Sequence, residues 1–262
     1  MFRDIVLCYL LQIGFTFGVI FIVGWLISLC NKAFYNNFGI YGNAVCYITG
    51  FVGTPVHELS HALFCVVFGH KITEIKLFQI SDDGTLGYVN HSYNPDNVYQ
   101  RIGNFFIGIA PITVISVLLY LLASALIPTY TESIREVSES ILSFNAGEIA
   151  VAFKKSVIVF FGGVESWRWW IFLLVGIFLS LHAALSGADI RNMLDGLWII
   201  LLVLLISDVI LRFIKKEILF SFTSAVVWAG TVVTSFLFVL LALSLIAVVI
   251  SLIFRYVLTK KK

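Results

Sequence analysis

Gly53-Thr-Pro-Val-His57-Glu58-Leu-Ser-His61-Ala-Leu-Phe-Cys-Val-Val-Phe68 places two histidines and a glutamate inside an otherwise apolar run. Residues four apart lie on one face of a helix, so the imidazoles of His57 and His61 can bind the same Zn²⁺. Glu58 then points toward a water at the open coordination position, and this pattern favours metal-assisted hydrolysis. The alternative is that these groups only pack or bridge helices. That alternative is costly in a membrane-buried helix unless the groups are paired or coordinated.

The residues just ahead of the motif predict an irregular helix. Gly50, Gly53 and Pro55 favour a kink or a restart, with Thr54 as the N-cap. Irregular backbone at membrane depth is tolerated mainly where it is buried in protein or lines a wet cavity. A hydrolase needs such a cavity.

The composition indicates an integral membrane protein. Of 262 residues, 60% are apolar and 12% are charged, and the mean hydropathy is +1.00. This charged share is about half that of a typical soluble domain. The net charge is only +2, and Lys and Arg stand mostly at the ends of apolar runs. We therefore expect the lipid bilayer as a partner and no nucleic acid.

Apolar runs predict an all-α polytopic membrane protein, a single transmembrane domain over residues 1–262 with about six transmembrane helices. The last run is so long that it must tilt, protrude or break near Gly230. Asp208, in the fifth run, is expected to reach toward Arg212 or Lys215. The terminal lysines favour both termini in the cytoplasm. The runs cover residues 5–29, 42–68, 101–127, 169–185, 197–211 and 218–254.

Two polar segments interrupt these runs. The first predicts a small β-hairpin beside the membrane at about residues 71–92, with a turn cluster at residues 81–84. Its edge can pair with extended substrate backbone, or it can be a mere connecting loop. His70 and His91 are expected to be solvated. The second segment, at about residues 128–168, has the pattern of an amphipathic surface helix.

A third metal ligand is expected near the end of the fourth apolar run. Catalytic zinc usually takes three protein ligands and leaves a fourth position for water. If the chain stays helical there, His182, Ser186 and Asp189 share one face, whereas Asp195 points elsewhere. We prefer Asp189 as the carboxylate ligand and keep Asp195 as its rival. Either aspartate can instead simply cap a broken helix.

Taken together, residues 42–200 resemble the site-2-type intramembrane zinc metalloproteases. The resemblance is carried by His57-Glu58-Leu-Ser-His61-Ala in a spanning helix, by the hairpin-like segment and by a later membrane-embedded aspartate. Gly108-Ile-Ala-Pro111 is similar to the family's small-Gly-Pro element, with Ala where Gly is usual. Leu194-Asp195-Gly196 is similar to its Leu-Asp-Gly motif but lacks the accompanying Asn-Pro and second Gly. The run Leu181-His182 through Ser186-x-x-Asp189-Ile instead resembles a divergent bacterial branch, which favours Asp189.

The resemblance implies Zn²⁺ as cofactor, a transmembrane protein as substrate, and hydrolysis of peptide bonds by a multi-pass protein of a bacterial cell membrane. His57, His61 and Asp189 would bind the metal, and Glu58 would be the general base, essential without being a ligand. Two other functions stay open. One is a zinc transporter, although the acidic groups gather near one site and no repeated halves are visible. The other is a noncatalytic scaffold.

Overall fold

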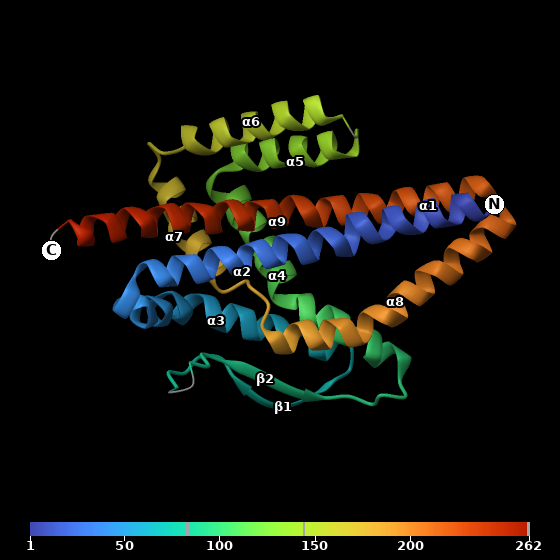
Figure 1. Cartoon of the computed structure of the whole chain (residues 1–262), viewed down its shortest axis with the longest axis horizontal. Helices are drawn as coiled ribbons and strands as arrows, with labels where there is room; N and C mark the ends of the chain where they lie inside the picture. The colour runs from blue at the N-terminus through green and yellow to red at the C-terminus, as the bar shows by residue number, and fades with distance from the viewer. Residues whose placement is uncertain (82–83, 144, 261–262) are drawn as a thin grey trace. The chain divides into compact units, whose positions relative to one another are not determined.

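The computed structural model describes residues 1–81, 84–143 and 145–260 (Figure 1). The chain is mostly helical and carries one two-stranded antiparallel hairpin, so the predicted fold class is confirmed. The predicted turn cluster at residues 81–84 and the terminal lysine cluster lie partly outside the described residues, because Asp82, Asp83, Lys261 and Lys262 are not among them.

The elements follow one another along the chain in this order. The helices are α1 (Phe2–Ile13), the π-helix η1 (Gly14–Gly18), α2 (Val19–Asn37), the 3₁₀ helix η2 (Gly39–Tyr41), α3 (Gly42–Val67), α4 (Val98–Leu126), α5 (Pro128–Leu142), α6 (Ala146–Gly162), α7 (Trp167–Leu181), α8 (Gly187–Ile214) and α9 (Lys216–Thr259). The strands are β1 (Lys71–Lys76) and β2 (Tyr88–Ser92), so the hairpin lies where the sequence predicts it. They pair from Lys71 with Ser92 to Lys76 with Tyr88, with an irregularity between Ile72 and Glu74.

Long apolar helices indicate a multi-pass membrane protein. Among the described residues, the helical stretches with the length and composition to cross a membrane are Phe2–Asn37, Val98–Leu126, Gly187–Ile214 and Lys216–Val257. The pair α6 and α7, bent by 114°, would add a fifth span. The apolar runs of the sequence predict about six transmembrane helices. Helix α3 is not among the candidates, because its histidines, glutamate and small polar residues lower its hydropathy.

Two helices are more regular than the sequence suggests. Helix α3 runs unbroken through Pro55, so the predicted restart with Thr54 as N-cap is wrong. The Thr54 hydroxyl instead lies 3.4 Å from His182 Nδ1. Helix α9 is likewise continuous through Gly230 and does not break there. Packing against neighbouring helices outweighs the local cost of proline and glycine in these segments.

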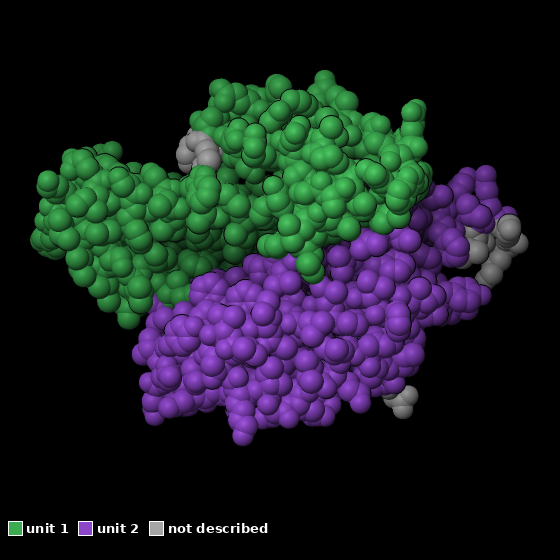
Figure 2. Space-filling model, turned by 180° about the vertical axis from the view of Figure 1, so that it is seen from behind, with its two compact units in different colours: residues 1–22, 116–173, 200–238 green, residues 23–115, 174–199, 239–262 purple. Residues whose placement is uncertain are grey.

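The chain forms two compact units, coloured separately in Figure 2. One unit comprises residues 1–22, 116–173 and 200–238, and the other comprises residues 23–115, 174–199 and 239–262. The single-domain expectation stays a prediction. In the second unit, Phe34, Leu181 and Ala247 form a buried apolar cluster. The motif, the hairpin, and both candidate aspartates belong to this second unit.

The first unit contains a buried polar contact that the sequence did not predict. Asp208 is fully buried, and Gln12 Nε2 donates to its Oδ1 at 2.9 Å and to Thr223 Oγ1 at 3.1 Å. The expectation that Asp208 reaches Arg212 or Lys215 is therefore wrong. Arg212 Nε instead donates to Asp4 Oδ2 at 3.1 Å. The hydrogen bond from Gln12 offsets part of the free-energy cost of burying the Asp208 carboxyl group.

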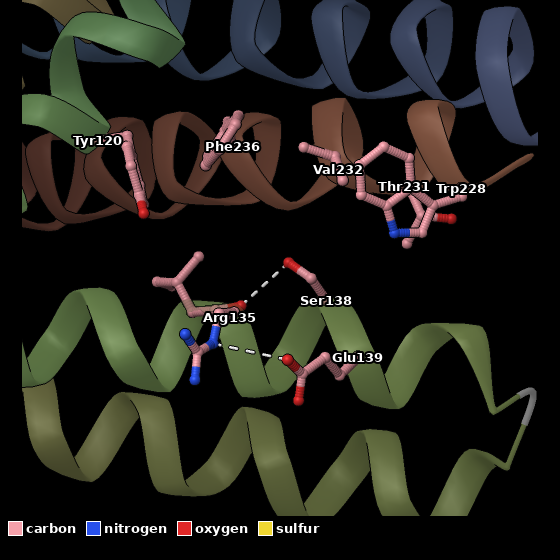
Figure 3. Close-up of a pocket in the computed structure, with 9 residues that line it drawn as sticks. Tyr120, Arg135, Ser138, Glu139, Trp228, Thr231, Val232 and Phe236 are labelled. Carbon is pink, nitrogen blue, oxygen red and sulfur yellow. Dashed lines mark hydrogen bonds and ion pairs between the residues drawn. The ribbon is translucent and has the colours of Figure 1, made fainter. Parts of the chain in front are cut away.

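The polar segment at residues 128–168 forms helices α5 and α6, which lie side by side (Figure 1). Lys155 on α6 donates to Glu136 on α5 at 2.6 Å. Residues of α5 and α9, together with Tyr120 of α4, line a cavity of about 260 Å³. Figure 3 shows these lining residues. The charged groups in its lining, Arg135 and Glu139, pair with each other at 3.5 Å. The lining of this cavity contains one carboxylate, Glu139, and no histidine, so it does not offer a set of metal ligands.

Candidate metal centre

Helix α3 brings the two motif histidines face to face. His57 Nε2 and His61 Nε2 are 3.1 Å apart, and the ring centroids are separated by 4.9 Å. This is the arrangement expected from their i, i+4 spacing. His61 is buried, and the His57 side chain is only 13% exposed. The predicted pair thus forms in a largely dehydrated site.

Asp189, in the first turn of α8, completes a set of three donors. Its Oδ1 lies 3.1 Å from His61 Nε2, and its Oδ2 lies 3.7 Å from His57 Nε2. The three ligand atoms all lie within 4.8 Å of one another. Among the described residues, this is the group of histidine, cysteine and acidic side chains that can hold a metal ion.

The hydrogen bonds on the far side of each ring fix where the protons lie. His57 Nδ1 donates to the carbonyl of His182 at 2.7 Å, and His61 Nδ1 donates to the carbonyl of Ile107 at 2.8 Å. A carbonyl oxygen only accepts, so each Nδ1 carries a proton and each neutral ring presents an Nε2 lone pair. Two lone pairs and a carboxylate converging on one point repel one another unless a cation lies between them. The donor set therefore fits a metal ion, and carbonyls that orient ligating histidines are the usual outer contacts of such sites.

A capping box holds Asp189 at the start of α8. Ser186 N donates to Asp189 Oδ2 at 2.7 Å, and Asp189 N donates to Ser186 Oγ at 3.2 Å. The chain leaves the helical conformation after Leu181, and α8 begins at Gly187, so residues 182–189 are not one helix. The shared helical face proposed for His182, Ser186 and Asp189 is thus wrong. Asp189 nevertheless reaches the histidines, and it caps the helix at the same time.

Glu58 lies between the metal donors and the hairpin. It is buried, and a Cβ at Gly87 would lie 2.8 Å from Glu58 Cγ. The hairpin backbone therefore packs directly on this carboxylate side chain. A cavity of about 330 Å³ opens beside it. Its lining joins α3, the hairpin and the loop before α8, and comprises Thr54, His57, Glu58, Thr85, Leu86, Gly87, Leu181, His182, Ala184 and Ser186.

Asp195, the rival third ligand, is not brought to the histidines. Its Oδ2 accepts from Tyr93 Oη at 2.9 Å and from Asn104 Nδ2 at 2.6 Å. Arg101 lies 4.0 Å from its other oxygen. This carboxylate therefore ties α8 to α4 and to the segment after β2, away from the metal donors. Asn104 is buried on α4, so its bond to Asp195 joins two packed helices.

His182 was expected as part of a helical face, and the structure gives it a different place. Its Nε2 lies 3.0 Å from Thr49 Oγ1 and 3.2 Å from Tyr35 Oη. The ring fits against Gly50 and Gly53 of α3. A Cβ at Gly53 would lie 2.6 Å from His182 Cδ2, and one at Gly50 would lie 3.2 Å from His182 Cε1. At position 53 only glycine leaves room for this ring, and at position 50 a methyl group would press against it.

His70 and His91 form a second histidine pair. Their Nδ1 atoms are 3.1 Å apart, and His70 Nε2 donates to the carbonyl of Gln100 at 2.8 Å. His70 is buried, so the expectation that it is solvated is wrong. Burial, with smaller effects of His70 and His61, lowers the pKa of His91 to about 4. These contacts are long-range, and no local pattern in the sequence signals them.

A comparison with protein families bears on this geometry. A family model described as "Putative zincin peptidase" matches residues 50–153. The match spans less than half of the chain and includes the motif, the hairpin and α4, but it ends before Asp189. No curated protein and no solved structure matches the chain. The match suggests a metallopeptidase and, with the candidate site of two histidines and an aspartate, suggests zinc as the metal.

Proposed function

We propose that this protein is a membrane-embedded, zinc-dependent metalloendopeptidase that cleaves peptide bonds in or near transmembrane segments of other membrane proteins. The observation that carries the proposal is the convergence of two Nε2 lone pairs and the Asp189 carboxylate at one point, with Glu58 adjacent. The family match and the long apolar helices support it.

His57, His61 and Asp189 would hold the metal. Zinc bound there would supply a Lewis acid and would lower the pKa of a bound water toward neutrality. The carbonyls of His182 and Ile107 hold the proton of each ring on Nδ1 and keep both Nε2 atoms turned inward, as ligating atoms must be. The site is largely dehydrated, and this strengthens every electrostatic interaction within it.

Glu58 acts as the proton carrier. Its carboxylate takes a proton from the attacking water and returns it to the nitrogen of the leaving amine. Its side chain is buried beside the cavity that holds His57, so it can reach a peptide placed there. It is not one of the three metal donors.

We further propose that the hairpin holds the substrate. A substrate helix hides its carbonyls in its own hydrogen bonds, so it must unwind locally before it is attacked. Thr85, Leu86 and Gly87 line the same cavity as Glu58. An extended peptide in that cavity lies against hairpin backbone, which is the geometry for adding a strand to an edge.

The deciding experiment compares the wild type with Glu58→Gln. Purified protein is tested for bound zinc and for cleavage of a transmembrane peptide reconstituted with it in liposomes. We expect Glu58→Gln to keep its zinc and to lose cleavage by about 10²-fold or more. A variant that still cleaves refutes the proposed role of Glu58. A wild type that cleaves nothing but moves zinc across the liposome membrane indicates a transporter instead.

The membrane placement is also a proposal. We place the protein in the cell membrane of a bacterium because of its resemblance to the divergent bacterial branch, and we place both termini in the cytoplasm because of the lysines at positions 260–262, which follow α9. Fusions of reporters that are active on only one side of the membrane to each terminus test this. Activity of a periplasmic reporter at either end would contradict it.

A further inference from the structure

Pro111, inside helix α4, lies one turn beyond the carbonyl that accepts the His61 proton. In an α-helix the N–H of residue 111 would donate to the carbonyl of residue 107. Proline has no N–H, and its ring pushes the carbonyl four residues earlier away from the helix axis. The Ile107 carbonyl is therefore released from its helical bond by the covalent chemistry of Pro111.

We propose that Pro111 is a positioning residue for the metal centre, because it frees the Ile107 carbonyl to hold His61. His61 Nδ1 donates to this carbonyl at 2.8 Å. That bond keeps the proton on Nδ1 and turns the Nε2 lone pair toward His57 and Asp189. Pro111 thus acts on the ring through Ile107 without touching a metal or a substrate.

Neighbouring contacts show that this part of α4 is built around the site. A Cβ at Gly108 would lie 2.5 Å from the Asp189 carbonyl and 2.7 Å from Met193 Cβ. Gly108 thus lets α8 approach α4 at the turn that carries the third donor. Gly108 and Pro111 therefore serve different donors of the centre: Gly108 gives room to the backbone of Asp189, and Pro111 releases the acceptor for His61.

Replacing Pro111 should affect metal affinity and helix stability differently. An interior proline weakens a helix, so replacing it with a residue that has an N–H should not weaken α4. The restored N–H draws the Ile107 carbonyl back toward the helix axis, and the His61 bond is bent or shared. Loss of an outer contact of this kind lowers metal affinity about 10-fold to 100-fold. Metal affinity should thus fall while the fold keeps its stability.

Pro111→Ala and Pro111→Val test this together. Both restore the N–H, but valine nearly keeps the volume of the buried proline ring. The full chain, purified in detergent and stripped of metal, is titrated with Co²⁺, and its visible spectrum and thermal unfolding are recorded. We expect both variants to bind Co²⁺ about 10-fold or more weakly, with a shifted spectrum, and the metal-free forms to unfold at the wild-type temperature or above. Pro128→Ala is the matched control, because Pro128 stands at the first position of α5, where no helical bond is lost.

The outcomes separate the possible roles. If Pro111→Val binds Co²⁺ like the wild type and only Pro111→Ala is impaired, packing explains the effect and the inference is overturned. A lower unfolding temperature for both metal-free variants overturns it as well. The inference rests on the proposed function only through its metal centre. A wild type that binds Co²⁺ but cleaves no peptide would refute the peptidase and leave the expectations for Pro111 intact.

Discussion

Replacing Gly87 with alanine should remove activity without removing the metal. The new Cβ would lie 2.8 Å from Glu58 Cγ, 2.8 Å from Thr54 Cγ2 and 2.9 Å from the Lys76 carbonyl. Carbon atoms in contact prefer about 3.5 to 4.0 Å, so the deficit is about 0.7 to 1.2 Å. Backbone lies on one side of the new methyl group. The hairpin or the Glu58 side chain must therefore move by about 1 Å.

A displacement of this size at a proton-transferring group can cost about 10²-fold in rate. We expect kcat for cleavage of a reconstituted transmembrane peptide to fall by that factor in Gly87→Ala. Zinc content should stay at the wild-type level, because the three atoms nearest to the new methyl group belong to Glu58, Thr54 and Lys76, none of which is a metal donor. Overpacking of this kind costs about 1 to 3 kcal/mol of stability, which the thermal unfolding of the variant reports.

The matched control is Gly162→Ala, because a Cβ at Gly162 meets nothing within 4 Å. It should cleave like the wild type. If Gly87→Ala also keeps the wild-type kcat, the hairpin does not pack on Glu58 as described and the argument fails. If Gly87→Ala loses its zinc, the hairpin supports the metal donors as well. The claim that it positions only Glu58 is then refuted.

Three further predictions concern groups around the centre. Asp189→Ala should lose bound zinc. Asp195→Ala should keep its zinc and lose about 1 to 3 kcal/mol of stability, because the buried Asn104 amide loses its acceptor. Metal analysis and thermal unfolding measure the two effects, and zinc loss only in Asp195→Ala would reverse the assignment of the third ligand. Ser186→Ala removes one half of the capping box, so the stability of the protein should fall by about 1 kcal/mol. Its zinc affinity should fall as well, because the capping box holds Asp189. An unchanged affinity in a zinc titration would mean that other contacts hold Asp189. The pKa of His91 is lowered from 6.5 to about 4, so between these pH values the unfolded chain binds a proton that the folded chain does not. Stability should therefore fall as the pH falls through this range, less steeply in His91→Gln, and equal slopes in pH-dependent unfolding would contradict this.

Local patterns predicted the centre of the site well. The spacing of His57 and His61 decides that their rings share a face of any helix, whatever surrounds it. The hairpin followed from alternation bounded by turn residues. The preference for Asp189 over Asp195 rests on a continuous helix and on the resemblance to a divergent bacterial branch, and the premise of a continuous helix is wrong. The sequence did hold the correct signal, because Ser186-x-x-Asp189 is a helix-start pattern.

The remaining features depend on partners far away in the chain. The acceptors for both imidazole protons are main-chain carbonyls, which have no signature in the side-chain sequence. The pairing of His70 with His91 and the burial of Asp208 against Gln12 also join distant residues. The apolar ends of α3 predict a transmembrane span, but the polar residues of the candidate metal centre lower the mean hydropathy of this helix.

The glycines at 50 and 53 carry a practical warning for redesign. Alanine normally strengthens a helix by about 1 kcal/mol relative to glycine, so routine thermostabilisation would choose it at both positions. Here a methyl group on residue 53 would collide with the His182 ring, whose carbonyl steadies His57. A library selected for heat resistance alone would thus enrich stable variants whose metal centre is disturbed. Both glycines should therefore be kept in any redesign.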